Sequence, residues 1–376
     1  MRIAMVTDSF YPTRDGVVTS LCITKKGLED RGHEVFVVAP DPGEEHRLPG
    51  VNYFPAVSFS KYKGYYVPIF PSNKREILES LDVDIIHVHG VAVMALKALI
   101  AARAIKKPLV LTFHTSVGDT MQYYSPIKMP REVSDRLVWT YLRYLLKGPL
   151  AVIAPTEPVA EELERMGVRT RRTAVIPTGS DVGRFNPSND GTAVREKLGL
   201  KGKKVLIYVG RISFEKNIGE IVEVMPLLDD TILMLVGKGP AEEMLRTKAE
   251  ALGVGDRVIF PGFVSDEELP SYYAAADAAI SASRFETQGL SIIEAMATGL
   301  PVVCVNERAF SSFVEDGKNG FLFEDNMLEA IEKALNASSE IREEARRTAE
   351  RFSIAASAKE LEDLYNDAII SADGKE

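Results

Sequence analysis

The sequence lacks the features that mark several large classes of protein. Its 376 residues include two cysteines, Cys22 and Cys304, which lie far apart and have neither disulfide-framework nor zinc-site spacing. So little cysteine is typical of a reducing cytoplasm. No apolar run approaches the roughly 20 residues of a membrane span, and the N-terminal MRIAMVTDSFYP is too short and polar for a signal peptide. We therefore expect a cytoplasmic protein that is soluble or, at most, peripheral on the inner face of the cell membrane.

Common nucleotide and metal signatures are also missing. The sequence contains neither G-x-G-x-x-G nor the P-loop pattern G-x-x-x-x-G-K-[ST], which weakens a nicotinamide or P-loop assignment. His87 and His89 lie two apart in HVHG, but no third ligand accompanies them. We predict that they are packing residues and that the protein has no metal site.

Charge is plentiful but unevenly distributed. The net charge of −9 argues against nucleic acid as a partner of the whole chain. Residues 1–180 carry 23 Lys and Arg against 19 Asp and Glu, whereas the remainder carries 22 against 35. This asymmetry suggests either an anionic partner for the first half or a drift in surface charge.

Two successive runs of apolar strands and helices predict an α/β protein with two Rossmann-like domains. Strands such as EVFVVAP and KVLIYVG are continuously apolar, as in parallel sheets covered on both faces. A Pro-, Gly- and Asn-rich stretch separates the runs. The predicted parts are an N-terminal domain, a linker, a C-terminal domain and a final helix, at 1–178, 179–190, 191–352 and 353–376.

Ligands of such sheets bind outside the carboxyl ends of the strands. Gly16 follows the first strand, at the start of a helix whose free amides a ligand can approach, and His114 ends the strand of PLVLTFHT. In the second domain, Arg211 and Lys216 in YVGRISFEKN suit a diphosphate. The backbone at Gly262 and Phe263 suits either the edge of a nucleobase or an ordinary turn.

The stretch RFETQGLSIIEAMATGLPVV places Glu286 before a predicted helix and Glu294 inside it. We expect Thr287 or Gln288 to begin this helix and the amides of Gly289 and Leu290 to be donors at its positive end. The two glutamates suit an acid/base pair, a ligand-binding pair, or one surface and one helix charge. Glu294 adjoins the apolar stripe, where a carboxylate needs partners such as sugar or ribose hydroxyls.

These motifs together resemble glycosyltransferase family 4, whose members are retaining enzymes with the GT-B fold of two facing domains and an interdomain cleft. The resemblance extends along nearly the whole chain. It rests on the E-x7-E spacing of Glu286 and Glu294, the turn at Asp15 and Gly16, FHT, IPTGSDVGRFNP, YVGRISFEKN, LVGKGP, FPGFVSDEELPSYYAAAD and EDGKNGFLF.

The resemblance implies roles for the second-domain residues toward a sugar nucleotide. Arg211 and Lys216 match the pair that binds the donor diphosphate and stabilises the leaving group in place of a metal. Glu286 matches the residue that holds the donor sugar hydroxyls, and Glu294 the residue that holds the ribose. Gly289 and Leu290 match amides that bind sugar and phosphate.

Two first-domain residues also match the family's site. Gly16 matches the glycine that closes on the phosphates, and His114 matches the histidine near the transferred sugar. The implied reaction is metal-independent transfer of a hexose with retention, from a UDP-hexose or alternatively a GDP-hexose. The acceptor hydroxyl attacks from the face that the diphosphate leaves.

The acceptor is expected to bind the first domain. The stretch SFSKYKGYYVPIFPSNKRE mixes bases and aromatics, as membrane-interface segments do, and predicts an acceptor or membrane site at Lys61, Lys63, Tyr65, Tyr66, Lys74 and Arg75. REVSDRLVWTYLRYLLKG is predicted as a helix that is either an ordinary core helix or a further membrane element, with Arg136, Trp139, Arg143, Leu146 and Lys147. The whole is most similar to the diacylglycerol glucosyltransferase branch, which implies a lipid acceptor and an anionic membrane surface as partners.

Three alternatives remain open at this level. The enzyme could act on a soluble sugar, sugar phosphate or polysaccharide. It could be a sugar-nucleotide epimerase on the same fold, or a protein that only binds the nucleotide sugar.

Overall fold

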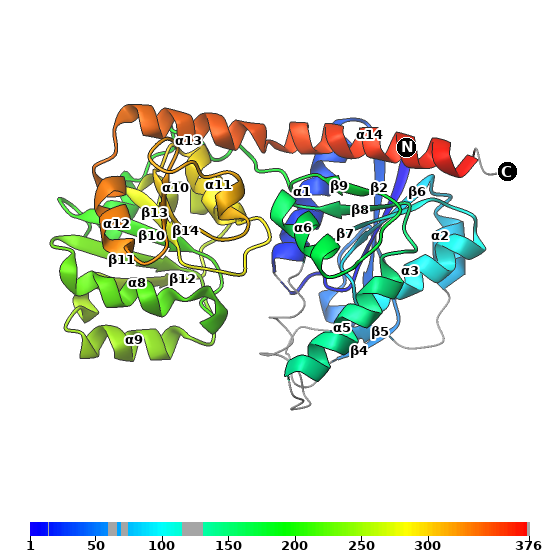
Figure 1. Cartoon of the computed structure of the whole chain (residues 1–376), viewed down its shortest axis with the longest axis horizontal. Helices are drawn as coiled ribbons and strands as arrows, with labels where there is room; N and C mark the ends of the chain where they lie inside the picture. Colours follow the sequence, from blue (N-terminus) through cyan, green and yellow to red (C-terminus); the bar gives the residue numbers. More distant parts are fainter. Residues whose placement is uncertain (14, 59–65, 69–73, 115–130, 374–376) are drawn as a thin grey trace. The chain divides into compact units, whose positions relative to one another are not determined.

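The computed structural model describes residues 1–13, 15–58, 66–68, 74–114 and 131–373, which divide into two compact units. The first unit comprises Met1–Gly179 together with Ile354–Glu376, and the second comprises Ser180–Ser353. Each unit is built around its own parallel sheet (Figure 1). The prediction of an α/β protein with two Rossmann-like domains is therefore confirmed.

The first unit contains a seven-stranded sheet in the order β3-β2-β1-β6-β7-β8-β9. Its strands are β1 (Arg2–Thr7), β2 (Glu34–Pro40), β3 (Val51–Phe54), β6 (Ile85–His89), β7 (Leu109–Thr112), β8 (Ala151–Ala154) and β9 (Thr173–Val175). All neighbours pair in parallel, and a separate antiparallel pair is formed by β4 (Ala56–Ser58) and β5 (Tyr66–Pro68). The strand order reverses between β1 and β6, which is where ligands of open α/β sheets bind.

Helices complete the first unit. They are α1 (Gly16–Asp30), α2 (Lys74–Ser80), α3 (Val93–Ala104), α5 (Arg131–Leu145), α6 (Glu157–Arg165) and α14 (Ile354–Asp373). The C-terminal helix α14 packs beside α1, although more than 300 residues separate them in the chain (Figure 1). Leu361, Leu364 and Tyr365 of α14 join the core on this side of the sheet. At the edge of that contact, Glu362 forms an ion pair with Arg31.

The second unit contains a six-stranded sheet in the order β12-β11-β10-β13-β14-β15. Its strands are β10 (Lys204–Val209), β11 (Thr231–Val236), β12 (Val258–Gly262), β13 (Ala278–Ser281), β14 (Val302–Val305) and β15 (Phe321–Phe323). The helices are α7 (Thr192–Lys197), α8 (Ile218–Val224), α9 (Glu242–Ala251), α10 (Leu269–Ala274), α11 (Leu290–Ala297), α12 (Met327–Leu335) and α13 (Ser339–Arg351). The order reverses between β10 and β13.

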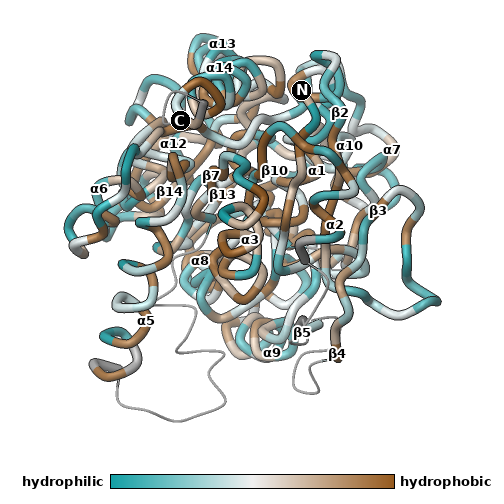
Figure 2. Tube along the Cα trace, turned by 90° about the vertical axis from the view of Figure 1, so that its right-hand side faces the viewer, coloured by the Kyte–Doolittle hydropathy of each residue, from teal (hydrophilic) through white to brown (hydrophobic). Residues whose placement is uncertain are grey.

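Burial of the strands explains why the sequence predicts this fold. Every residue of β11, β13 and β14 is buried, as expected for strands with helices on both faces. Figure 2 shows β13 and β14 as predominantly hydrophobic, whereas teal stretches recur on the helices. Within the described ranges, no helix is long and apolar enough to span a membrane.

Candidate active site

An ion pair lies at the reversal point of the second sheet. The Lys216 ammonium is 2.6 Å from Oε1 of Glu286. Lys216 lies in the loop that follows β10, and Glu286 lies in the loop that follows β13. Both side chains are about three-quarters buried, with 24% and 22% exposed. A cation and a carboxylate, 70 residues apart in the chain, are thus joined where such sheets bind ligands.

The loop geometry around Lys216 explains how the pair is held. A short 3₁₀ turn, Phe214–Lys216, ends at Asn217, whose φ of 52° lies in the left-handed region that asparagine tolerates. The Asn217 amide donates to the carbonyl of Ala282, 3.3 Å away, just beyond β13. This bond ties the loop after β10 to the loop after β13. It therefore fixes the position of Lys216 relative to Glu286.

Helix α11 begins four residues after Glu286, at Leu290. Its N-cap is Gly289, with a φ of 80°, and a Cβ at this position would lie 2.5 Å from the ring of Phe310. Only glycine fits both constraints. The expectation that Thr287 or Gln288 begins the helix is wrong, because the left-handed Gly289 delays the helix to Leu290. The first amides of α11, including that of Leu290, point to the N-terminal end without intrahelical acceptors, as an anion site requires.

Glu294 lies one turn into α11 and has a phenolic partner. The Tyr273 hydroxyl, from α10, donates to Oε2 of Glu294 at 2.9 Å and lies 3.0 Å from the carbonyl of Ser291. Burial raises the pKa of Glu294 to about 7, although the bond from Tyr273 and the Arg184 charge oppose the shift. The carboxylate is therefore under-compensated and suited to accept further hydroxyl donors.

The raised pKa of Glu294 predicts a pH-dependent stability. Since the folded-state pKa, about 7, exceeds the ordinary 4.5, the folded protein binds more protons than the unfolded chain between these values. The stabilising contribution is complete below pH 4.5 and is lost as the pH rises through 7. The free energy of unfolding of the wild type minus that of Glu294→Gln is measured by urea unfolding. We expect this difference to fall as the pH rises from 4.5 through 7.

Comparison with the variant isolates this contribution from other groups. Burial also raises the pKa of Asp8, to about 6, but Asp8 contributes equally to both proteins. Wild-type and Glu294→Gln profiles that stay parallel from pH 4 to 8 would show that Glu294 does not titrate as described.

The remaining second-unit candidates occupy neighbouring strand ends. Arg211 is exposed and follows β10, and its carbonyl accepts a 3.0 Å bond from the buried Tyr208 hydroxyl. Gly262 ends β12, and the 56% exposed Phe263 follows it. The structure thus places Arg211, Gly262 and Phe263 at the same edge of the sheet as Lys216 and Glu286.

Two candidates belong to the first unit. Gly16 is the first residue of α1, and Asp15 caps the helix by accepting from the amides of Val17 and Val18 at 3.0 and 2.9 Å. A Cβ built on Gly16 meets nothing within 4 Å, so packing among the described residues does not demand glycine. Room at this helix start is consistent with approach of a ligand to the backbone. His114 lies two residues beyond β7, and burial lowers its pKa to about 4.

Most of the predicted acceptor residues, or their side chains, lie outside the described part of the structure. Lys61, Lys63 and Tyr65 lie outside the described residues. Lys74 and Arg75 begin α2, but their side chains are also outside the described part. Tyr66 opens β5 and is half-buried. The predicted acceptor segment therefore stays a prediction.

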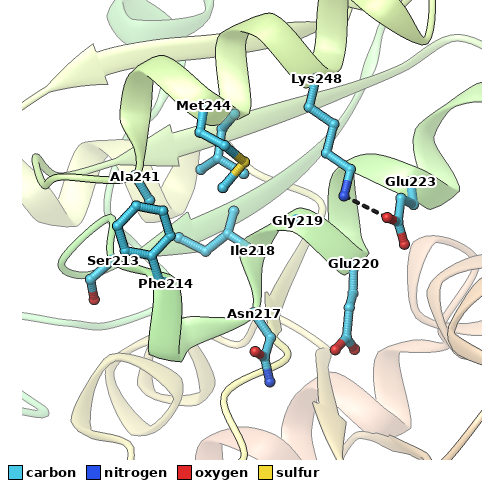
Figure 3. Close-up of a pocket in the computed structure, with 11 residues that line it drawn as sticks. Ser213, Phe214, Asn217, Ile218, Gly219, Glu220, Glu223, Ala241, Met244 and Lys248 are labelled. Carbon is cyan, nitrogen blue, oxygen red and sulfur yellow. Dashed lines mark hydrogen bonds and ion pairs between the residues drawn. The ribbon is translucent and has the colours of Figure 1, made fainter. Parts of the chain in front are cut away.

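A hollow of about 190 Å³ lies between α8 and α9 (Figure 3). Phe214, Ile218 and Met244 gather at it, and an ion pair between Lys248 and Glu223 lies beside it. Its volume is below the roughly 300–1,000 Å³ typical of small-molecule sites. It includes neither Lys216 nor the glutamates of α11 and its preceding loop. The hollow is therefore distinct from the candidate active site.

Sequence reasoning missed several residues that the structure adds to these sites. Tyr273 and His89 each bond to a predicted site residue, and Asp8 accepts from the amides of Ala92 and Met94 at the start of α3. Asp8 ends the run RIAMVTD, so its place beyond a strand was the available signal. Within the described ranges, no three or more His, Cys, Asp or Glu side chains gather where they could hold a metal ion.

Comparison with known proteins matches both halves of the chain to glycosyltransferases. The profile Glycosyltransferase Family 4 matches residues 14–184, and Glycosyl transferases group 1 matches residues 190–353. An alpha-monoglucosyldiacylglycerol synthase of Streptococcus pneumoniae is 32% identical over 391 residues, covering 99% of this chain and 87% of that protein. The chain belongs to glycosyltransferase family 4. The family resemblance predicted from the sequence is confirmed.

Other curated relatives are similar to this chain at comparable identity. The alpha-monoglucosyldiacylglycerol synthase of Acholeplasma laidlawii is 30% identical, with 87% of this chain and 85% of that protein covered. A GDP-mannose-dependent alpha-mannosyltransferase of Mycolicibacterium smegmatis is 28% identical, with 90% and 88% covered. Family membership therefore establishes a glycosyltransferase without fixing the sugar.

Solved structures of low identity share the GT-B fold. HepE from Anabaena in complex with UDP-glucose superposes with a TM-score of 0.77 at 22% identity, covering 97% of this chain and 99% of that one. Sucrose-phosphate synthase from Thermosynechococcus elongatus reaches 0.80 at 20% identity, covering 99% and 100%. These likenesses confirm the predicted GT-B class for this family-4 chain.

Proposed function

We propose that this protein is a retaining glycosyltransferase that moves a hexose from a nucleoside-diphosphate sugar, preferably a UDP-hexose, to a glycerolipid hydroxyl at a membrane surface. The observation that carries the proposal is the Lys216–Glu286 pair at the reversal point of the second sheet. It offers a cation to phosphate and a carboxylate to sugar hydroxyls within one site. Names of the relatives from Streptococcus and Acholeplasma support the lipid acceptor.

Donor binding exchanges partners within this pair. Lys216 and Glu286 neutralise each other at 2.6 Å. An arriving diphosphate competes for Lys216, with Arg211 as a second cation from the same loop. Glu286 is then released to accept bonds from the sugar hydroxyls. Glu294, half-buried beside Tyr273, takes the ribose hydroxyls, and the amides of α11 meet the phosphate side.

Catalysis then depends on charge placement. The bond between the anomeric carbon and the β-phosphate oxygen breaks, and the electrons leave with the diphosphate. Lys216 and Arg211 stabilise this charge, and Glu286 stabilises the positive charge that develops on the sugar. The acceptor oxygen bonds to the anomeric carbon on the same face, and its proton passes to the leaving phosphate oxygen.

The outer face of α5 supports a membrane-bound acceptor. Its exposed residues include Val133, Leu137 and Tyr144, which are 47%, 57% and 68% exposed, respectively. Exposed basic residues lie near them, at Arg136 and Arg143 of α5 and at Lys147 two residues beyond its end. Apolar and basic groups on one helix suit an anionic lipid surface. Trp139 and Leu146 are instead buried in the core, as the core-helix alternative expects, whereas the exposed side chains support the membrane alternative.

A double substitution on α5 tests this surface. We expect Leu137→Glu with Tyr144→Glu to weaken binding to anionic phosphatidylglycerol vesicles by about tenfold or more, because apolar area is removed and negative charge added. Vesicle sedimentation measures the loss.

UDP affinity of the double variant should be unchanged, because none of the candidate donor-binding residues lies in α5. Leu227→Glu is the matched control, as Leu227 is 64% exposed in the second unit. Equal vesicle binding by wild type and the α5 variant would contradict a membrane role for this helix.

The function as a whole is tested by nucleotide release from UDP, GDP and ADP sugars, with diacylglycerol vesicles and soluble acceptors in parallel. Release that requires lipid supports the proposal. Release only with a soluble sugar, sugar phosphate or polysaccharide would identify the alternative acceptor class. Donor conversion without acceptor would indicate an epimerase, and donor binding without turnover a binding protein.

A further inference from the structure

Three histidines lie together at the carboxyl edge of the first sheet. His87 and His89 share a face of β6, being two residues apart, and His114 follows the neighbouring β7. Nδ1 of His89 is 3.1 Å from Nε2 of His114. The two histidines of HVHG, predicted as packing residues, are indeed buried, each with 1% exposed. One of them also contacts the family-matched His114 directly.

The contact between His89 and His114 has hydrogen-bond geometry. The ring planes differ by 15°, and the centroids are 5.3 Å apart. Two five-membered rings whose nitrogens are 3.1 Å apart reach so large a centroid separation only when they meet edge to edge. The shared hydrogen therefore lies near both ring planes, where the nitrogen lone pair accepts it.

Burial determines which ring donates. It lowers the pKa of His114 to about 4 and that of His89 well below the ordinary value, so both rings are neutral and each carries one N–H. Nε2 of His89 is buried without a partner among the described residues. If His114 donated, the His89 proton would sit on this nitrogen as a buried N–H without an acceptor. Because orphaned donors are rarer and costlier than unfilled acceptors, His89 Nδ1–H is the donor.

The neighbouring His87 ring packs against His89 and restricts its rotation. The His87 ring lies 4.1 Å from the His89 ring, centroid to centroid. His87 is itself held at both nitrogens, by the Tyr365 hydroxyl on Nδ1 and the Thr112 hydroxyl on Nε2, each at 2.6 Å. Tyr365 is fully buried and comes from α14. The C-terminal helix thus helps to hold the ring against which His89 packs.

We propose that His89 is a positioning residue that holds His114 in the tautomer with its proton on Nδ1. In this state Nε2 of His114 is occupied as an acceptor, so His114 meets a ligand as a hydrogen-bond donor and not as a general base. The consequence for turnover rests on the proposed role of His114 beside the transferred sugar, whereas the tautomer does not.

The tautomer of His114 is measured in the wild-type protein, and a variant is needed only to assign the signals. Long-range ¹H–¹⁵N spectra of histidine-labelled wild type distinguish protonated from bare ring nitrogens, and a His114→Ala spectrum identifies the His114 signals. We expect a protonated Nδ1 and a bare Nε2 at His114. A protonated Nε2 would overturn the proposal.

Two variants then separate positioning from packing. His89→Asn keeps a side-chain N–H near the place of Nδ1–H, whereas His89→Phe keeps a ring without a donor. We expect His89→Phe to lose the Nδ1 tautomer of His114 and lower kcat by about 10- to 100-fold, with His89→Asn restoring most of both. Equal losses in the two variants would show that His89 only fills space. If the tautomer is as expected but His114→Ala retains full turnover, the proposed role of His114 fails and the tautomer assignment stands.

Discussion

Replacing Glu286 by glutamine is expected to lower kcat by about 10²- to 10³-fold, the usual scale for one electrostatic group at a reacting centre. Glutamine keeps the size of the side chain and its ability to meet sugar hydroxyls. It loses the charge that faces the developing positive sugar. Turnover of UDP-glucose with diacylglycerol vesicles measures the effect.

Nucleotide binding distinguishes this loss from a damaged site. On the proposed function, the Glu286 carboxylate, 2.6 Å from the Lys216 ammonium, competes with the donor phosphate for this cation. The Glu286→Gln variant should therefore bind UDP at least as tightly as wild type, as measured by calorimetry. Glu307→Gln is the matched control, because Glu307 forms a more exposed ion pair with Arg284 and should leave kcat unchanged. Unaltered turnover of Glu286→Gln would contradict the proposed role of Glu286 in stabilising the developing positive charge on the sugar.

Replacing Lys216 by methionine is the second large expected effect. The substitution keeps an unbranched side chain but removes the cation that we propose binds the diphosphate, and it leaves Glu286 without its 2.6 Å partner. We expect kcat/KM to fall by about 10²- to 10³-fold, because charge on the leaving group loses its stabilisation. The affinity for UDP should fall with it.

The binding of uridine separates phosphate recognition from a general disturbance. Uridine lacks the diphosphate, so Lys216→Met should lower the affinity for UDP and leave the affinity for uridine unchanged. Lys248→Met is the control, because Lys248 pairs with Glu223 on the neighbouring surface and not with a candidate site residue. An equal loss for UDP and uridine would mean that Lys216 supports the fold of the loop and not the phosphate.

The fold was largely predictable from the sequence because its strands are buried on both faces. A continuous apolar run such as TILMLV can be recognised as a buried strand from the local sequence alone. In the structure this run forms β11, and every residue of it is buried. The start of α11 was not predictable in the same way. Gly289 has a left-handed backbone and lies against Phe310, a contact that local sequence does not reveal.

The site was predictable in its residue types but not in its contacts. The position of Lys216 and Glu286 after their strands brought them to one edge of the sheet, yet their 2.6 Å pairing depends on how Asn217 ties the two loops together. Tyr273 precedes Glu294 by 21 residues on a different helix, and only packing of α10 brings the hydroxyl to the carboxylate. Such pairs depend on side-chain geometry, which residue spacing does not encode.

The central claim is transfer of hexose to a lipid with retention, and one product analysis tests it most directly. The enzyme is incubated with UDP-α-glucose labelled with ¹³C throughout the sugar and with diacylglycerol vesicles, and the lipid is examined by mass spectrometry and NMR. We predict a monoglucosyl diacylglycerol that carries the intact labelled ring as the α-anomer. A β-linked product would contradict retention, and label found only in free glucose or a soluble glycoside would contradict the lipid acceptor.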